Sequence, residues 1–118
     1  MTAEEFRRIA LSHVEAVESS HGGHPDFRVG GKIFATLGYP NDGFGAVMLT
    51  PQDQELLIRD FPTTFKPAAG SWGASGSTIV TLKGANKRAV TIALESAWRK
   101  RAPKRLTTPP DRKPGRRA

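Results

Sequence analysis

Two adjacent glycines, Gly30 and Gly31, constrain the fold of this chain more than any other feature of its sequence. They separate two short runs of aromatic and β-branched residues, 27–29 and 32–37. The two-residue turns that close antiparallel hairpins need positive φ at their central positions, and glycine adopts positive φ without steric cost. The sequence therefore predicts an antiparallel hairpin, and with it an antiparallel sheet.

Further strands are predicted on both sides of a central helix. Residues 40–43 read as a turn, and the apolar run 44–49 that follows them predicts a third strand. Residues 78–83 form a β-branched strand. The segment 65–77 is rich in Gly, Ala and Ser and predicts an irregular strand or a long hairpin loop. The sheet should thus contain four or five strands.

The first helix is marked by a capping box. Thr2 and Glu5 are placed so that each side chain can reach the backbone amide of the other residue. Apolar residues then recur at a spacing of three to four, which predicts a helix that continues to about Ser19.

Two more helices follow from similar signals. Thr50 as N-cap and Pro51 at the first helical position predict a short helix to about Asp60. Its buried face is expected to hold Leu56, Leu57 and Phe61. The last helix is predicted over residues 85–100, with two adjacent buried rows, Ala89/Ala93/Ala97 and Val90/Leu94/Trp98.

This order of elements predicts the α+β class, with helices on one face of an antiparallel sheet. The length of 118 residues allows one domain and a tail. We expect the domain to span residues 1–105 and the basic, proline-rich residues 106–118 to form a disordered tail.

The charge of the chain, +7 with a pI near 10.4, is concentrated at one end. Residues 1–99 carry ten basic and ten acidic side chains, and the stretch from Lys100 onward holds eight basic residues against Asp111 alone. The folded domain is formally neutral, and the basic stretch is typical of segments that bind nucleic acid or another polyanion. A solubilising terminus is the alternative interpretation.

Composition excludes several classes of protein. The absence of cysteine excludes disulfides, iron–sulfur clusters and thiolate zinc sites. No apolar run reaches the ~18 residues of a membrane span, and Glu4 and Glu5 stand where a signal peptide would be basic. We therefore expect a cytoplasmic protein that does not contact membranes.

No residue set suggests catalysis or a cofactor. His21, His24 and Asp26 form a short string that superficially suggests a metal site, but two histidines make only half of a zinc site, and a structural role at the start of a strand is the expectation. Ser12 and His13 are neighbours on a predicted helix and point in different directions. We expect no enzyme activity, no metal and no cofactor.

Five short segments stand in a distinctive order along the chain. They are His24-Pro25-Asp26-Phe27-Arg28-Val29, Gly31-Lys32-Ile33-Phe34-Ala35, Trp72-Gly73, Ala97-Trp98-Arg99 and Ala102-Pro103-Lys104. In this order and at these spacings, the chain resembles the YjbR/MmcQ family of small bacterial proteins over about residues 3–105. The resemblance implies a frataxin-like fold, with an antiparallel sheet packed against N- and C-terminal helices, and it implies DNA binding.

The leading hypothesis is a non-enzymatic DNA-binding protein with weak sequence selectivity, aided by its basic tail. Arg28 and Lys32 are expected to face each other across the hairpin as a basic finger. The other candidate DNA-binding residues, most of them phosphate contacts, are Lys66, Trp72, Lys83, Lys87, Arg88, Lys104 and Arg105.

Trp72 leaves two interpretations open. Its indole either stacks on a base or ligand, or caps the open edge of the sheet core. The alternative function is a small-molecule- or protein-binding module, in which a cleft near Trp72, Phe27 and Lys32 takes a ligand.

Overall fold

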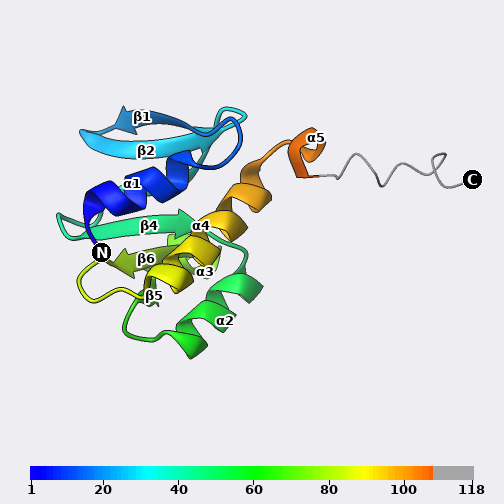
Figure 1. Ribbon diagram of the computed structural model, residues 1–118. Helices are drawn as coiled ribbons and strands as arrows, with labels where there is room; N and C mark the ends of the chain where they lie inside the picture. Colours follow the sequence, from blue (N-terminus) through cyan, green and yellow to red (C-terminus); the bar gives the residue numbers. More distant parts are fainter. Residues whose placement is uncertain (108–118) are drawn as a thin grey trace, which may run out of the picture.

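The computed structural model describes residues 1–107, which form a six-stranded antiparallel sheet with α-helices (Figure 1). The strand order is β1-β2-β3-β4-β6-β5. The predicted α+β class and its antiparallel sheet are confirmed. The elements are α1 (Ala3–Leu11), β1 (Val17–His21), β2 (His24–Val29), β3 (Lys32–Leu37), β4 (Phe44–Met48), α2 (Pro51–Asp60), β5 (Phe65–Pro67), α3 (Gly70–Ala74), β6 (Ser77–Thr81), α4 (Lys87–Arg101) and α5 (Lys104–Thr107).

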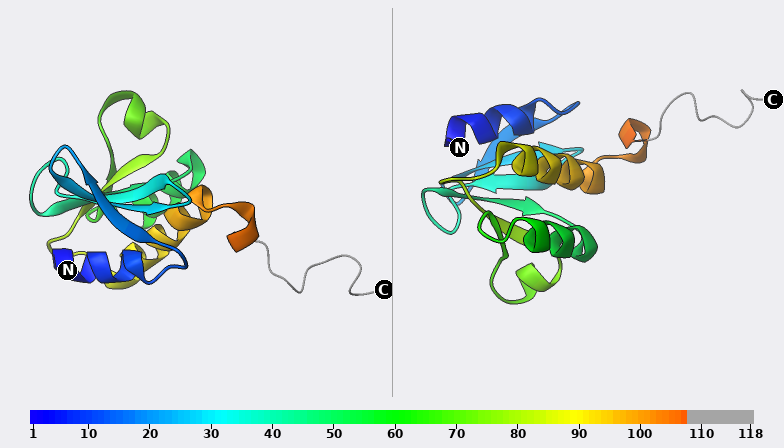
Figure 2. Two further views of the ribbon diagram at one scale, coloured as in Figure 1. Left: turned by 90° about the horizontal axis from the view of Figure 1, so that it is seen from above. Right: turned by 60° about the horizontal axis from the view of Figure 1, so that its bottom comes forward.

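The N- and C-terminal helices pack together on one face of the sheet. Figure 2 shows α1 and α4 side by side on this face, with α3 on the far side of the sheet. Directly paired residues share a face, and the pairs Phe27–Ala35, Ala35–Val47 and Val47–Thr78 place a fully buried row under the helices. The hydrophobic core therefore lies between this face and α1 and α4.

The predicted hairpin is confirmed as β2 and β3, and it contains one irregularity. Gly30 and Gly31 have φ of 59° and 80° in the turn. Phe27 pairs with Ala35 and Arg28 with Ile33, so Phe34 is an additional residue in β3. This β-bulge turns Phe34 and Ala35 both toward the core, where both are fully buried.

The predicted start of the first helix is confirmed, but its predicted end is wrong. The capping box forms between Thr2 and Glu5, yet α1 ends at Leu11. Glu15 then reverses the chain with φ 59°, and residues from Val17 onward pair with β2 as an edge strand. The indole of Trp98 donates a hydrogen bond of 3.0 Å to the Val14 carbonyl oxygen, a tertiary contact that holds this segment outside a helix.

The predictions for the other two long helices are largely confirmed. Thr50 caps α2 as expected, and both predicted rows of α4 are buried. Leu56, predicted to be buried, is 47% exposed, because Leu57 and a buried Gln54 face the core instead. Helix α4 begins at Lys87, since the side chain of Asn86 accepts from the amide of Ala89 as its N-cap.

The segment 65–77, expected to be an irregular strand or a long hairpin loop, contains a short strand and a helix. Strand β5 spans Phe65–Pro67, in agreement with the first alternative, and the one-turn helix α3 at Gly70–Ala74 was not expected. Leu106 lies in α5 with Thr107 and packs against the core. The rest of the predicted disordered tail, residues 108–118, lies outside the described residues.

The hairpin tip touches the segment that follows α4. A Cβ added at Gly30 would lie 3.0 Å from the ring of Pro103, so glycine allows this close approach.

Within residues 1–107, no helix has the length and apolar character needed to cross a membrane.

Candidate ligand-binding cleft

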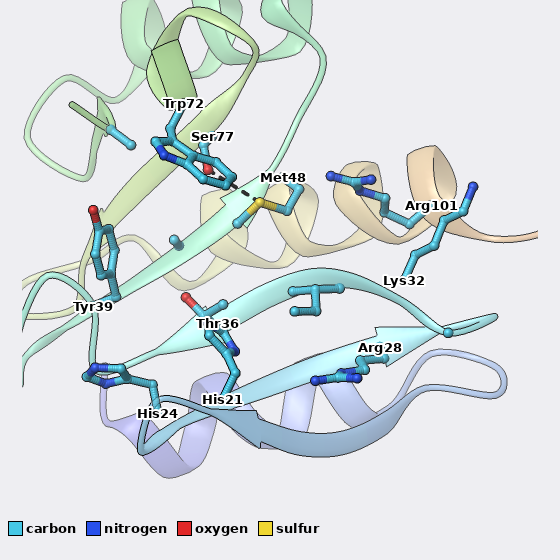
Figure 3. A pocket seen from close by; sticks show the side chains of 14 residues that line it. His21, His24, Arg28, Lys32, Thr36, Tyr39, Met48, Trp72, Ser77 and Arg101 are labelled. Carbon is cyan, nitrogen blue, oxygen red and sulfur yellow. Dashed lines mark hydrogen bonds between the residues drawn. The ribbon is translucent and has the colours of Figure 1, made fainter. Parts of the chain in front are cut away.

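The sheet face opposite the helices carries a cleft. Asp26, Thr36, Ala46 and Ile79 form a continuous row across four strands, and this row alternates with the core-facing row. Helix α3 overhangs this face and bounds an open cavity of about 680 Å³. Figure 3 shows its lining residues, which are His21, His24, Arg28, Gly31, Lys32, Ile33, Thr36, Tyr39, Ala46, Met48, Ala68, Trp72, Ser77 and Arg101.

A buried carboxylate organises the β1–β2 wall of the cleft. Asp26 has no solvent exposure and accepts hydrogen bonds from Arg28, at 2.8 Å from Nε and 3.0 Å from Nη2. Its second oxygen also lies 2.7 Å from Nδ1 of His21. The bonds from Arg28 lower the pKa of Asp26, and the bond from His21 lowers it further. Burial raises this pKa, but the net result is a pKa below the ordinary value of an aspartate. Asp26 is thus ionised, and its negative charge is compensated by its neighbours Arg28 and His21.

The opposite wall is an exposed aromatic ring. Trp72 lies in α3 and is 69% exposed, so the prediction that it caps the core is wrong. Gly73 fixes α3 in place, because a side chain there would collide with the carbonyl oxygen of Ala68. Behind the ring, the hydroxyl of Ser77 donates to Sδ of Met48 at 3.3 Å. The large flat surface of Trp72 is therefore available to a ligand.

Positive charge without a carboxylate partner gathers at one end of the cleft. Figure 3 shows Arg101 and Lys32 at this end and Tyr39 and His24 at the other. Among the ion pairs of residues 1–107, neither Arg101 nor Lys32 takes part. The adjacent Lys100 donates to the Leu49 carbonyl oxygen at 2.7 Å, and burial first, then the charge of Arg101, lowers its pKa.

Two buried polar atoms of the cleft residues have no hydrogen-bond partner among the described residues. They are Oγ1 of Thr36, on the sheet floor, and Nε of Arg101, at the end of α4. Thr36 as a whole is only 7% exposed. Buried polar groups in folded proteins are nearly always paired, so each of these two atoms marks a position where a ligand or water is expected.

Three of the residues predicted for binding meet in the cleft. Arg28, Lys32 and Trp72 all line it. Arg28 pairs across the hairpin with Ile33 and Lys32 with Val29, so the two cations do not face each other as predicted. The two-residue turn is the reason for this offset, because it pairs Val29 with Lys32 and so places Arg28 opposite Ile33.

Phe27, expected beside the ligand, is fully buried on the helix side of the sheet, where its ring packs 6.2 Å from that of Phe6. Lys66 lies over the ring of Phe44 at 5.9 Å, outside the cleft lining. Neither residue therefore belongs to the cleft, because β2 presents Phe27 to the core and β5 carries Lys66 to the sheet edge.

The remaining predicted cations are spread over the molecule. Lys83 follows β6, and Lys87 and Arg88 are the first residues of α4, at the opposite end of that helix from Arg101. Lys104 and Arg105 lie in α5, and Arg105 is paired with Glu15 at 2.8 Å and 2.9 Å. This pairing raises the pKa of Arg105 and lowers that of Glu15. The predicted set does not form one basic face.

The sequence string His21, His24 and Asp26 is a structural unit. His21 and Asp26 are hydrogen bonded, and His21 and His24 flank the β1–β2 turn as paired residues. Across residues 1–107, no three His, Asp or Glu side chains are grouped closely enough to hold a metal ion.

The chain is similar to one protein family in sequence and to a solved structure in fold. A family model described as YjbR matches residues 10–100. The crystal structure of protein DR2400 from Deinococcus radiodurans, which has a DUF419 domain, is similar with a TM-score of 0.69. The alignment covers 98% of this chain and 85% of that one, at 17% identity, and so shows a common fold. No curated protein matches the sequence.

Proposed function

The chain belongs to the YjbR family, and from the geometry of its own uncovered sheet face we propose that it is a non-enzymatic binding protein that holds a small ligand in the cleft beside Trp72. The observation that carries this proposal is the cavity of about 680 Å³ with an indole, 69% exposed, on its wall. Cavities of this size bind cofactor-sized and drug-sized molecules, and exposed aromatic rings at their walls supply much of the contact.

Binding rather than catalysis agrees with the pairing of the polar side chains. Asp26 accepts from Arg28 and His21 and has no solvent exposure, so it is not open to a substrate as a general base. The hydroxyl of Ser77 is directed at the thioether of Met48, not at a histidine. A nucleophile needs a base within hydrogen-bonding distance. The hydroxyl of Ser77 has no such base, and Asp26 is not placed to act as one.

The experiment is a ligand titration of the full chain, followed by calorimetry and by tryptophan fluorescence. The panel contains neutral and anionic aromatic compounds. We expect binding that Trp72→Phe preserves, because a flat ring remains, and that Trp72→Ala weakens by about tenfold, as for the loss of one stacked ring. Ile92→Ala, at an exposed apolar position of α4 outside the cleft lining, is the control. If no compound binds, or if Trp72→Ala binds as well as the control, the proposal is wrong.

A second candidate function, DNA binding through phosphates with weak sequence selectivity, is favoured by one specific contact. Because Gly30 touches Pro103, the hairpin with Lys32 meets the end of α4 with Arg101 and the start of α5 with Lys104. Three cations from distant parts of the sequence are thereby gathered at one end of the molecule.

DNA binding predicts a different response to mutation. Each phosphate contact that is lost reduces the slope of log affinity against log salt by about one, so Lys104→Gln should lower both the affinity for duplex DNA and this slope. Lys87→Gln, at the other end of α4, is the matched control. Equal slopes for the two variants would argue against DNA binding at this end.

A further inference from the structure

The cleft combines two features that together define a class of ligand. One is the flat face of Trp72 on α3, and the other is the pair of partnerless buried atoms, Oγ1 of Thr36 and Nε of Arg101. All three residues line the same cavity. The proposed function uses only the first feature, so the second remains to be explained.

The donors at the cationic end match an anion. Nε of the Arg101 guanidinium is only a donor. The hydroxyl of Thr36, which lies away from the cationic end in Figure 3, is both a donor and an acceptor and suits a polar group elsewhere on the same ligand. A guanidinium presents a planar fork of N–H groups that fits phosphate or carboxylate oxygens. A neutral ligand would give the charge of Arg101 no counter-charge.

The local charges point the same way. Asp26 is the acidic side chain at the cleft wall, and Arg28 and His21 already satisfy it. Lys32 and Arg101 therefore leave a positive excess at their end of the cleft. Burial and the charge of Arg101 lower the pKa of the adjacent Lys100, which is consistent with a surrounding that lacks a nearby carboxylate.

We infer that the cleft takes a nucleoside monophosphate unit, with its base stacked on Trp72, a polar group of the nucleoside bound to the hydroxyl of Thr36, and its phosphate bound by Arg101 and Lys32; this rests on the proposed function and names its ligand class. A flat ring and an anionic group at a distance from the ring are the two parts of this unit. The cavity volume, about 680 Å³, accommodates both parts together. The unit occurs as a free nucleotide and as an unpaired nucleotide of a single strand.

Calorimetry of the full chain with AMP, adenosine and inorganic phosphate tests the class. AMP is expected to bind about tenfold more tightly than adenosine, the gain of one charge-assisted contact, and phosphate should compete with AMP. Arg101→Met keeps much of the aliphatic stem and removes one of the two charges at the cationic end, so it should reduce the preference for AMP over adenosine.

Thr36→Val separates binding from folding. The substitution keeps the shape and deletes the partnerless hydroxyl, so AMP affinity should fall several-fold while the thermal midpoint stays equal or rises. Thr91→Val on α4 is the matched control, because the Thr91 hydroxyl donates to Lys87 and lies outside the cleft lining. A lower midpoint for Thr36→Val would show that its hydroxyl is already satisfied in the free protein and would overturn this assignment.

The outcomes distinguish this inference from the proposed function. Equal affinity for AMP and adenosine overturns the anion assignment and leaves the cleft as a binding site. Binding of other ring compounds but of neither AMP nor adenosine also overturns the nucleotide class alone. Absence of all binding removes both proposals.

A second titration, with a dA6 single strand, distinguishes a free nucleotide from a nucleotide within a strand. A dA6 single strand that binds more tightly than AMP, and that AMP displaces, identifies a strand as the source; AMP that binds more tightly than dA6 identifies a free nucleotide. Both support the inference. Binding of dA6 that Arg101→Met and Trp72→Ala leave unchanged contradicts it.

Discussion

Arg28 holds the fully buried carboxylate of Asp26 with two hydrogen bonds, 2.8 Å from Nε and 3.0 Å from Nη2, from two positions farther along the same strand. Residues two apart on a strand share a face, so the pair lies entirely on the cleft side of the sheet. The cleft wall therefore depends on a charge that has no contact with water.

Asp26→Asn should lower the free energy of unfolding. The amide cannot accept both bonds from Arg28 as a carboxylate does, and the expected loss is about 2 kcal/mol, less than for a fully buried pair because Arg28 is 32% exposed. Asp60→Asn, which removes an exposed partner of Arg59, should cost under ~0.5 kcal/mol. Urea unfolding at neutral pH measures both, and similar losses for the two variants would contradict the prediction.

The stability of the wild-type protein should fall in acid because of the same carboxyl group. The pKa of Asp26 is lower in the folded state than in the unfolded chain, so the unfolded chain takes up the proton first as pH falls. The contribution is present above pH ~4, the ordinary range of an aspartate, and is lost as pH falls through the lowered pKa. Unfolding curves between pH 7 and pH 2 should show a smaller acid loss for Asp26→Asn.

Gly76→Ala should destabilise the protein strongly. Gly76 has φ 117°, and a Cβ at this position would collide with the carbonyl oxygen of Leu49. The expected loss is at least ~3 kcal/mol. Gly22→Ala is the matched control, because Gly22 also has positive φ, 54°, with nothing within 4 Å of an added Cβ. Its loss should be only about 1 kcal/mol. Thermal unfolding compares the two, and equal losses would rule out the steric explanation.

Gly73→Ala should displace Trp72 without unfolding the core. The added Cβ would collide with the Ala68 carbonyl oxygen, so α3 must move away from the sheet. Near-UV circular dichroism and ligand affinity should both change. Ser71→Ala, at an exposed position of the same helix, should alter neither. Retention of full ligand affinity by Gly73→Ala would show that the position of α3 does not shape the site.

The sequence predicted the turns and helix starts correctly, because interactions between residues close in sequence determine them. The glycine pair of the hairpin, the capping box at Thr2 and the Thr50-Pro51 helix start each act within a few residues. The helix predicted over residues 12–19 is wrong because Val14 and Val17 continue a helical spacing. The conformation of this segment is decided instead by pairing with β2 and by the bond from Trp98, which is distant in sequence.

The candidate site was predictable only in part, for the same reason. Arg28, Lys32 and Trp72 stood out as cations on a hairpin and as an aromatic residue among glycines. Thr36 and Arg101 gave no such signal. The orientation of Thr36 depends on an irregularity in β3, and Arg101 reaches the cleft only because the end of α4 lies against the hairpin tip.

The additional residue in β3 determines which side chains reach the cleft. Ile33 and Thr36 are three apart, a spacing that points to opposite sides of a regular strand, yet both line the cavity. They do so because Phe34 and Ala35 together fill the core layer between them. The shape of the ligand site is therefore encoded in the length of a strand as much as in its residue types. Deletion of one residue here would turn part of the wall inward while leaving the composition almost unaltered.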